Sequence, residues 1–178
     1  MLRSKYDCIL STSKTINSDN SRLDCRIEGL ENKSPDVIII DRKLKLKKNN
    51  YFNLDKKRKI YLFTQANNKK KEIYFKRKKI RVIKFPKIES DVDFREMLRK
   101  INSLGYTRIL VESGLIFLNF LHENKIINNL YIFKSSNKLK SKGTNNCKNL
   151  FIKNLKKLKT INVNLFGDIL HKKSFKNV

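Results

Sequence analysis

A lone carboxylate, Glu112, stands where an apolar strand gives way to an apolar helix in the segment ILVESGLIFLNFL, residues 109–121. The residues that follow it are Ser113 and Gly114. Glycine lets the backbone turn tightly and lets a ligand approach it, and the free N–H groups and positive dipole end of a helix start favour a phosphate or pyrophosphate. Glu112 would then accept hydrogen bonds from a polar substrate ring. The alternative for this local pattern is a strand-to-helix turn with a capping acid.

Two other predicted strands also end in polar side chains. The first runs into residues 11–13, followed shortly by Thr15 and Asp19, and the second ends at Asp41 and Arg42. In open α/β sheets, ligands bind beyond the carboxyl ends of the strands. We therefore expect these side chains to line one cleft together with the lone carboxylate described above.

Strands that alternate with helices are predicted to hold these side chains. The segment PDVIIID, residues 35–41, is a continuous apolar run that ends in an acid. Such a run is typical of a strand covered on both faces, as in a mostly parallel sheet. Residues 15–27 are rich in Asn, Asp and Ser and are predicted to form a loop. The pattern indicates an α/β fold, with an antiparallel piece near the C-terminus.

The expected elements cover most of the chain. Strands are predicted in 6–13, 35–41, 58–64, 80–85, 106–112 and 128–136, helices in 67–79, 89–105 and 114–124, and a final β element, interrupted at Gly167-Asp168, in 160–173. The helix in 89–105 has Ser90 as its expected N-cap and closes at Gly105. Its expected apolar face consists of Val92, Met97, Leu98, Ile101 and Leu104.

The composition sets limits on the class of protein. The 178 residues fit one domain, and 42 Lys and Arg against 16 Asp and Glu give a formal net charge of +26. Such a charge is typical of a partner that is nucleic acid or an anionic surface. The lysines are nevertheless spread along the whole chain and form no single basic and aromatic stripe. We therefore favour a dispersed surface charge and expect no nucleic-acid partner.

The cysteines and apolar runs exclude other classes. The three cysteines have neither CxxC spacing nor neighbouring histidines, so we expect no metal site. An odd cysteine count and the lack of a secretory signal predict a reducing, cytoplasmic location. The longest apolar runs have about ten residues, too few to span a bilayer.

Five motifs in order resemble one family, the reductase domain of the bifunctional riboflavin-biosynthesis deaminase/reductase. The first motif places an Arg before an apolar strand, followed by a pattern of the type T-x-x-x-D-N-S-x-L-x-x-R. The segment RSKYDCILSTSKTINSDNSRLDCR matches it, and PDVIIID, VESGLIFLNFL, IINNLYIF and FGDIL occupy the places of the other four. Together they span nearly the whole chain.

The resemblance implies a dihydrofolate-reductase-like fold and a reaction. The family reduces 5-amino-6-(5-phosphoribosylamino)uracil with NADPH, transferring hydride to carbon 1 of the ribose. The positions that contact substrate in the family correspond to Arg3, Leu23, Arg26 and Glu112. The positions that contact NADPH correspond to Thr15, Asp19, Arg42, Gly114, Leu115, Ile116, Phe117, Leu118, Asn119 and Phe120. No residue is predicted as the catalytic proton donor.

The chain departs from the family pattern at its N-terminal side. The family's first strand, an S-L-D-G-type segment and the zinc deaminase domain have no counterpart in it. We therefore expect a single reductase-like domain, residues 1–178, truncated at its N-terminus and lacking the family's first strand. The resemblance further implies a homodimer, a phosphorylated pyrimidine substrate and a deaminase domain encoded upstream.

Three alternatives stay open at this point. One is a dihydrofolate-reductase-like enzyme that acts on another substrate, although Arg3 and Arg26 favour a phosphorylated one. Another is a basic nucleic-acid-binding module, which predicts strongly salt-dependent binding to any duplex. The last is an inactive remnant of the enzyme.

Overall fold

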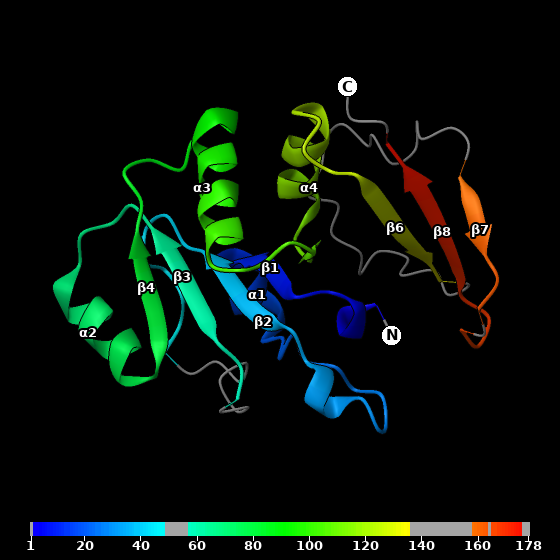
Figure 1. Ribbon diagram of the computed structural model, residues 1–178, viewed down its shortest axis with the longest axis horizontal. Coiled ribbons are helices and arrows are strands. Elements are labelled where there is room, and N and C mark those ends of the chain that lie inside the picture. The colour runs from blue at the N-terminus through cyan, green and yellow to red at the C-terminus, as the bar shows by residue number, and fades with distance from the viewer. Residues whose placement is uncertain (1, 49–56, 136–157, 164, 176–178) are drawn as a thin grey trace. The chain divides into compact units, whose positions relative to one another are not determined.

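The computed structural model describes residues 2–48, 57–135, 158–163 and 165–175 (Figure 1). Two compact units make up the chain, Met1–Ser113 and Gly114–Val178. The hypothesis that all 178 residues form one reductase domain stays a prediction. Among the helices that the model describes, none has the length and apolar character needed to cross a membrane.

The first unit contains a five-stranded parallel sheet in the order β4-β3-β2-β1-β5. Its strands are β1 (Cys8–Thr12), β2 (Asp36–Ile40), β3 (Ile60–Thr64), β4 (Ile80–Lys84) and β5 (Ile109–Val111). All are within segments predicted to be strands, and every pairing between them is parallel. The predicted α/β fold with a mostly parallel sheet is confirmed.

Three helices connect these strands: α1 (Ser13–Asp19), α2 (Lys69–Arg77) and α3 (Asp91–Ser103). Short 3-10 turns, η1 and η2, occupy Arg3–Lys5 and Glu31–Lys33. Since crossovers between parallel strands are right-handed, α1 and α2 cover one face of the sheet and α3 covers the other. In Figure 1, α1 lies behind β1 and β2. Ile16 of α1 and Phe75 of α2 accordingly belong to one buried cluster with alternate residues of β1, β2 and β3.

Helix α1 corrects the prediction of a loop throughout residues 15–27. The side chain of Thr12 accepts a hydrogen bond from the backbone N–H of Thr15, which caps the helix start. Ile16, the one large apolar residue of the helix, is fully buried. Asn20 ends it in the left-handed conformation, with φ of 47°. A cap and one buried side chain therefore outweigh the turn-forming composition.

Helix α3 follows its prediction closely at the start. Ser90 and Asp93 form a capping box, in which each side chain accepts a hydrogen bond from the other residue's backbone N–H. The apolar face is slightly rotated from the expected one, because Phe94 is buried while Val92 is 64% exposed. The first turn of the helix therefore faces solvent at Val92.

The described residues of the second unit form one helix, α4 (Leu115–Glu123), and three antiparallel strands in the order β6-β8-β7. These strands are β6 (Asn129–Lys134), β7 (Lys159–Ile161) and β8 (Ile169–Ser174). The ring of His122, on α4, contacts that of Phe175 just after β8, with 5.1 Å between centroids. The predicted C-terminal antiparallel element is confirmed, including its interruption at Gly167, which has φ of 96°.

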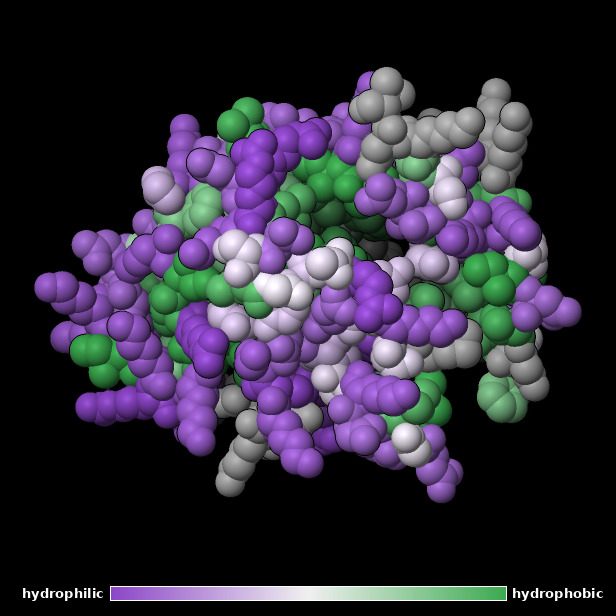
Figure 2. All heavy atoms as spheres, viewed as in Figure 1, coloured by the Kyte–Doolittle hydropathy of each residue, from purple (hydrophilic) through white to green (hydrophobic). Residues whose placement is uncertain are grey.

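The visible surface of the protein is mostly hydrophilic. On the face drawn in Figure 2, hydrophilic side chains cover most of the area and do not gather in one stripe. The dispersed distribution of the +26 charge stays a prediction.

Candidate active site

Hydrogen bonds join the ends of β1, β2 and β5, and the common cleft expected at these ends stays a prediction. The hydroxyl of Ser11 donates to the backbone carbonyl of Glu112 at 2.6 Å. The hydroxyl of Ser13 donates to the Asp41 carboxylate at 2.9 Å. Since β1 lies between β2 and β5, its polar end residues connect those of both neighbours.

Glu112 forms a bidentate ion pair with Arg3. The Nε and Nη2 atoms of Arg3 each lie 2.8 Å from a different carboxylate oxygen of Glu112, across 109 positions of sequence. This geometry is the strong, planar form of the Arg–carboxylate contact. The hydrogen bond from Arg3 to Glu112 raises the pKa of the guanidinium further. The two side chains are 27% and 30% exposed and hence remain accessible to a ligand.

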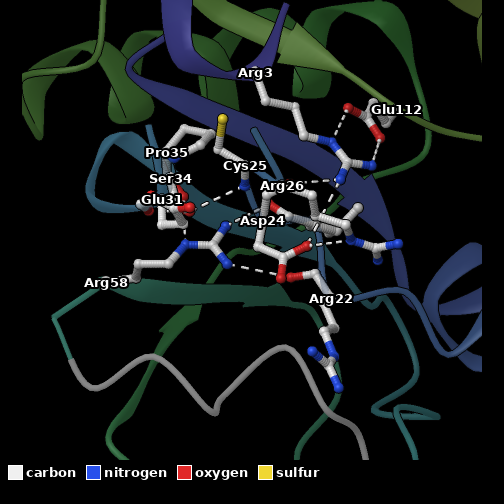
Figure 3. A network of polar contacts seen from close by, with 11 residues as sticks. Arg3, Arg22, Asp24, Cys25, Arg26, Glu31, Ser34, Pro35, Arg58 and Glu112 are labelled. Carbon is white, nitrogen blue, oxygen red and sulfur yellow. Dashed lines mark hydrogen bonds and ion pairs between the residues drawn. The ribbon is translucent and has the colours of Figure 1, made fainter. Parts of the chain in front are cut away.

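Asp24 connects this pair to Arg26. Nη1 of Arg3 donates to the backbone carbonyl of Asp24 at 2.7 Å, and Nε of Arg26 donates to its carboxylate at 2.9 Å. Burial opposes ionisation of Asp24, but the hydrogen bond from Arg26 and the charges of Arg26 and Arg3 lower its pKa overall. The Arg26 side chain is 65% exposed. Arg26 therefore presents its guanidinium to solvent beside an otherwise fixed cluster (Figure 3).

Leu23 lies in the same loop, and its predicted contact with substrate stays a prediction. Its side chain is 2% exposed and belongs to the buried cluster beneath the sheet. Its φ of 54° is in the left-handed region, which is unfavourable for a residue with a branched side chain. Leu23 therefore anchors the loop in the core.

The predicted cofactor residues of the first unit lie on α1 and after β2. Thr15 is on the first turn of α1, where its hydroxyl lies 3.0 Å from that of Thr12. Asp19 is the exposed last residue of the same helix. Arg42 is exposed, and its guanidinium donates to the backbone carbonyl of Ile88 at 3.4 Å. Cofactor contact by these three residues stays a prediction.

Asp41, next to Arg42, is buried and engaged in hydrogen bonds within the protein. It is 2% exposed and accepts hydrogen bonds from the backbone N–H groups of Lys45 and Leu46 at 2.8 and 2.7 Å, besides the bond from Ser13. The carboxylate therefore closes the loop after β2.

In the second unit, Gly114 is the N-cap of α4 and Leu115 to Phe120 are helical. Among the described residues, no side-chain hydrogen bond caps the start of this helix. Gly114 has φ of −68°, which any residue adopts, so the expected tight turn does not require glycine. A Cβ atom there would meet no other described atom within 4 Å. Open space beside a helix start fits a pyrophosphate.

A hollow of about 540 Å³ occurs elsewhere in the first unit. Its lining lies around the amino ends of β3 and β4 and consists of Lys57, Arg58, Lys59, Lys76, Lys79, Ile80, Arg81 and Val82. None of the predicted site residues lines it. We therefore assign the candidate site to the polar cluster between β5 and the loop after α1.

The sequence matches the family model of the RibD C-terminal domain over residues 1–147. The chain belongs to this family. No curated protein matches it. RibD of Acinetobacter baumannii has a similar fold, with a TM-score of 0.70 and 13% identity over 96% of this chain and 47% of that one. A pyrimidine reductase-like protein of Corynebacterium diphtheriae gives a TM-score of 0.74 at 15% identity, covering 99% of this chain and 79% of that one.

The deaminase/reductase of Thermotoga maritima is also similar in fold. Its TM-score is 0.66 at 20% identity, and the match covers 96% of this chain and 46% of that one. This chain thus spans about half the length of the Acinetobacter baumannii and Thermotoga maritima proteins. At such identities the likeness shows the shared fold, while the family model shows the membership.

Sequence reasoning missed two charged residues of the site region, Asp24 and Arg58, and the loop-closing role of a third, Asp41. Asp24 was passed over because it lies inside a stretch predicted to be a polar loop. Arg58 belongs to the run DKKRK, which is typical of a solvated surface, yet it is 8% exposed. Asp41 was noted only as a polar strand end. No local pattern in the sequence distinguishes a buried Arg in a basic run from its exposed neighbours.

Proposed function

We propose that this RibD C-terminal domain binds NADPH and reduces 5-amino-6-(5-phosphoribosylamino)uracil to the ribitylamino compound. The observation that carries the proposal is the cluster of Arg3, Glu112 and Arg26 around Asp24. Three residues predicted to contact substrate are linked there by hydrogen bonds of 2.7–2.9 Å. Family membership adds the reaction class.

The charges of the cluster suit a phosphorylated pyrimidine. Arg26 offers an exposed guanidinium to the ribose phosphate, and such groups bind phosphate oxygens bidentately. Glu112 keeps acceptor sites on both oxygens and can accept N–H groups of the pyrimidine ring. Arg3 uses three of its five N–H groups on Glu112 and Asp24, so its main part is to orient Glu112.

NADPH supplies the hydride in this reaction. The residues that the resemblance to the family assigns to it include Thr15, Asp19 and Gly114. The share of the protein itself is to fix the ribose phosphate and the ring so that carbon 1 is held in a reactive orientation. A helix start such as that of α4 favours the negative charge of a pyrophosphate through the positive end of the helix dipole.

The substrate assignment is tested with Glu112→Gln, which keeps the shape of the side chain and removes its charge. We expect the substrate Kd to rise about tenfold, as for loss of a charge-assisted hydrogen bond, with NADPH affinity unchanged. Loss of the partly exposed pair with Arg3 should cost about 1 kcal/mol of stability and a few degrees in melting temperature. Glu28→Gln, an exposed carboxyl in the same region, is the control. A melting shift with unchanged substrate Kd would leave Glu112 as a purely structural acid.

The cofactor assignment is tested at Gly114. Because a Cβ there meets no described atom, both Gly114→Ala and Gly114→Val should fold. We expect calorimetry to show NADPH Kd rising modestly for Ala and by about tenfold or more for Val, as the larger side chain fills the space in front of the helix start. An unchanged NADPH Kd in Gly114→Val would remove the helix start from the cofactor site.

A further inference from the structure

Arg58 is a buried guanidinium that lies two residues before β3. It is 8% exposed, although both of its sequence neighbours, Lys57 and Lys59, are exposed lysines. A buried cation is costly unless its N–H groups are satisfied. Its burial therefore requires specific partners.

Three of those partners are backbone carbonyls. Nε of Arg58 donates to Pro35 at 2.7 Å, Nη2 donates to Leu23 at 2.7 Å, and Nη1 donates to Arg22 at 3.2 Å. Pro35 directly precedes β2, while the other two carbonyls belong to the loop after α1. The guanidinium thus ties this loop to the amino ends of β2 and β3 (Figure 3).

The loop that Arg58 holds is conformationally unfavourable. The carbonyls of Arg22 and Leu23 lie on either side of Leu23, whose φ is 54°. A left-handed non-glycine residue persists only where its surroundings fix it. The next residue, Asp24, carries the carbonyl that accepts from Arg3 and the carboxylate that accepts from Arg26.

We propose that Arg58 is a positioning residue for the substrate site: by binding the carbonyls of Arg22 and Leu23 it holds Asp24 where Arg3 and Arg26 meet. This inference rests on the proposed function for its link to substrate. The contact from Arg58 to the loop is independent of that link and has its own readout. Arg58 acts through the loop and touches no substrate.

Cys25 provides that readout, since it follows Asp24 and its thiol is buried, at 5% exposure. Its backbone N–H donates to the hydroxyl of Ser34, on the far side of the loop. Cys8 of β1 is the internal reference, because it is fully buried in the sheet and burial raises the pKa of its thiol to about 12. Replacing Cys147 by Ser in every variant leaves these two thiols to be followed.

The first experiment measures the rate at which a thiol reagent modifies each cysteine, with the site identified by mass spectrometry. In Arg58→Met we expect Cys25 to react about tenfold faster or more, because the loop opens locally, while Cys8 stays protected. Lys59→Met removes the same charge one residue along and should change neither rate. Unchanged protection of Cys25 in Arg58→Met would overturn the proposal.

The second experiment measures ligand affinity in the same variants. Arg58→Met should raise the Kd of the phosphorylated substrate about tenfold and change that of NADPH by less than twofold. If unmodified protein binds no substrate, the proposed function fails while the thiol result still decides the role of Arg58. Faster modification of Cys25 with an unchanged substrate Kd would reduce Arg58 to a structural residue.

A conservative variant covers the case in which Arg58→Met unfolds and exposes both cysteines. Arg58→Lys keeps the charge and length but replaces the planar fork with one ammonium group, which cannot reach three carbonyls at once. We expect it to fold, with intermediate reactivity of Cys25 and an intermediate substrate Kd. Full protection of Cys25 and full affinity in Arg58→Lys would show that the fork geometry is not needed, and would overturn the proposal.

Discussion

Two loops of the first unit are each held by one buried charged side chain, and the two side chains have opposite charges. Each contains a buried left-handed leucine, Leu23 with φ of 54° and Leu44 with φ of 49°. The loop at residues 22–26 is held by the buried cation of Arg58, which donates to backbone carbonyls. The loop at residues 41–46 is held by the buried anion of Asp41, which accepts from backbone N–H groups.

The two loops differ in the sequence distance over which they are held. Asp41 binds N–H groups four and five residues after itself, whereas Arg58 reaches carbonyls 35 and 36 residues before itself. The loop at 41–46 is therefore closed by its own first residue. The loop at 22–26 is held by Arg58, which is distant in the sequence, and presents charged side chains outward. We infer that the first is mainly structural and that the second positions a site.

The largest effect is expected for Asp41→Ala. This change leaves the N–H groups of Lys45 and Leu46 and the hydroxyl of Ser13 without their acceptor, in or near the core. The free energy of unfolding should fall by roughly 3–5 kcal/mol, because several buried donors lose a charged partner. Chemical denaturation measures it, with Asp19→Ala, at an exposed carboxyl, as the control for lost charge. A loss below about 1 kcal/mol would contradict the role assigned to Asp41.

The paired variants Leu23→Ala and Leu44→Ala compare the loops directly. Both leucines are almost fully buried, so each variant should lose roughly 2–5 kcal/mol of stability. Only Leu23→Ala should also weaken substrate binding, because only its loop carries Asp24. Denaturation and calorimetry with substrate, done on both variants under conditions where each is folded, separate the two effects. Equal loss of substrate affinity in both would break the distinction between the loops.

A third test, Arg26→Ala, probes the outward face of the loop at 22–26. The side chain is 65% exposed, so stability should change little. Loss of a charge-assisted phosphate contact, worth roughly 1.5–3 kcal/mol, should raise the substrate Kd about tenfold to a hundredfold. Arg22→Ala, an exposed arginine of the same loop, is the matched control. Substrate affinity unchanged by Arg26→Ala would move phosphate binding elsewhere.

The smallest effect is expected for Asp7. Like Asp41, its carboxylate accepts hydrogen bonds from backbone N–H groups, but it lies nearer the surface. Hydrogen bonds from Arg108 and Thr107 lower the Asp7 pKa from 3.8 to about 2. The largest contribution comes from the backbone N–H of Arg108. A depressed pKa in the folded state stabilises the fold above pH 4, and this contribution is lost as pH falls from about 4 to about 2. With the side chain 23% exposed, we expect about 1 kcal/mol. Asp7→Asn should flatten the pH dependence of stability in that interval; an unaltered slope would contradict the assignment.

Much of the fold follows from local patterns in the sequence. The segments that form β1 to β3 are mostly continuous apolar runs, and a strand buried on both faces needs that pattern wherever it lies. The cap of α3 at Ser90 is likewise a local signal. Helix α1 was missed because its Ser, Asn and Asp residues favour turns equally well, and burial of Ile16 under the sheet decided between the two outcomes.

For the site, too, the sequence predicts some features and only the folded structure decides others. The sequence by itself determined the motif residues Arg3, Arg26 and Glu112, since ordered spacing along the chain is enough to identify a family. Only the tertiary structure decided that Arg3 pairs with Glu112, and that Arg58 is buried while its lysine neighbours are exposed. The reason is physical: a charged side chain is stabilised in the interior by specific donors and acceptors, and here they come from parts of the chain that only folding brings together.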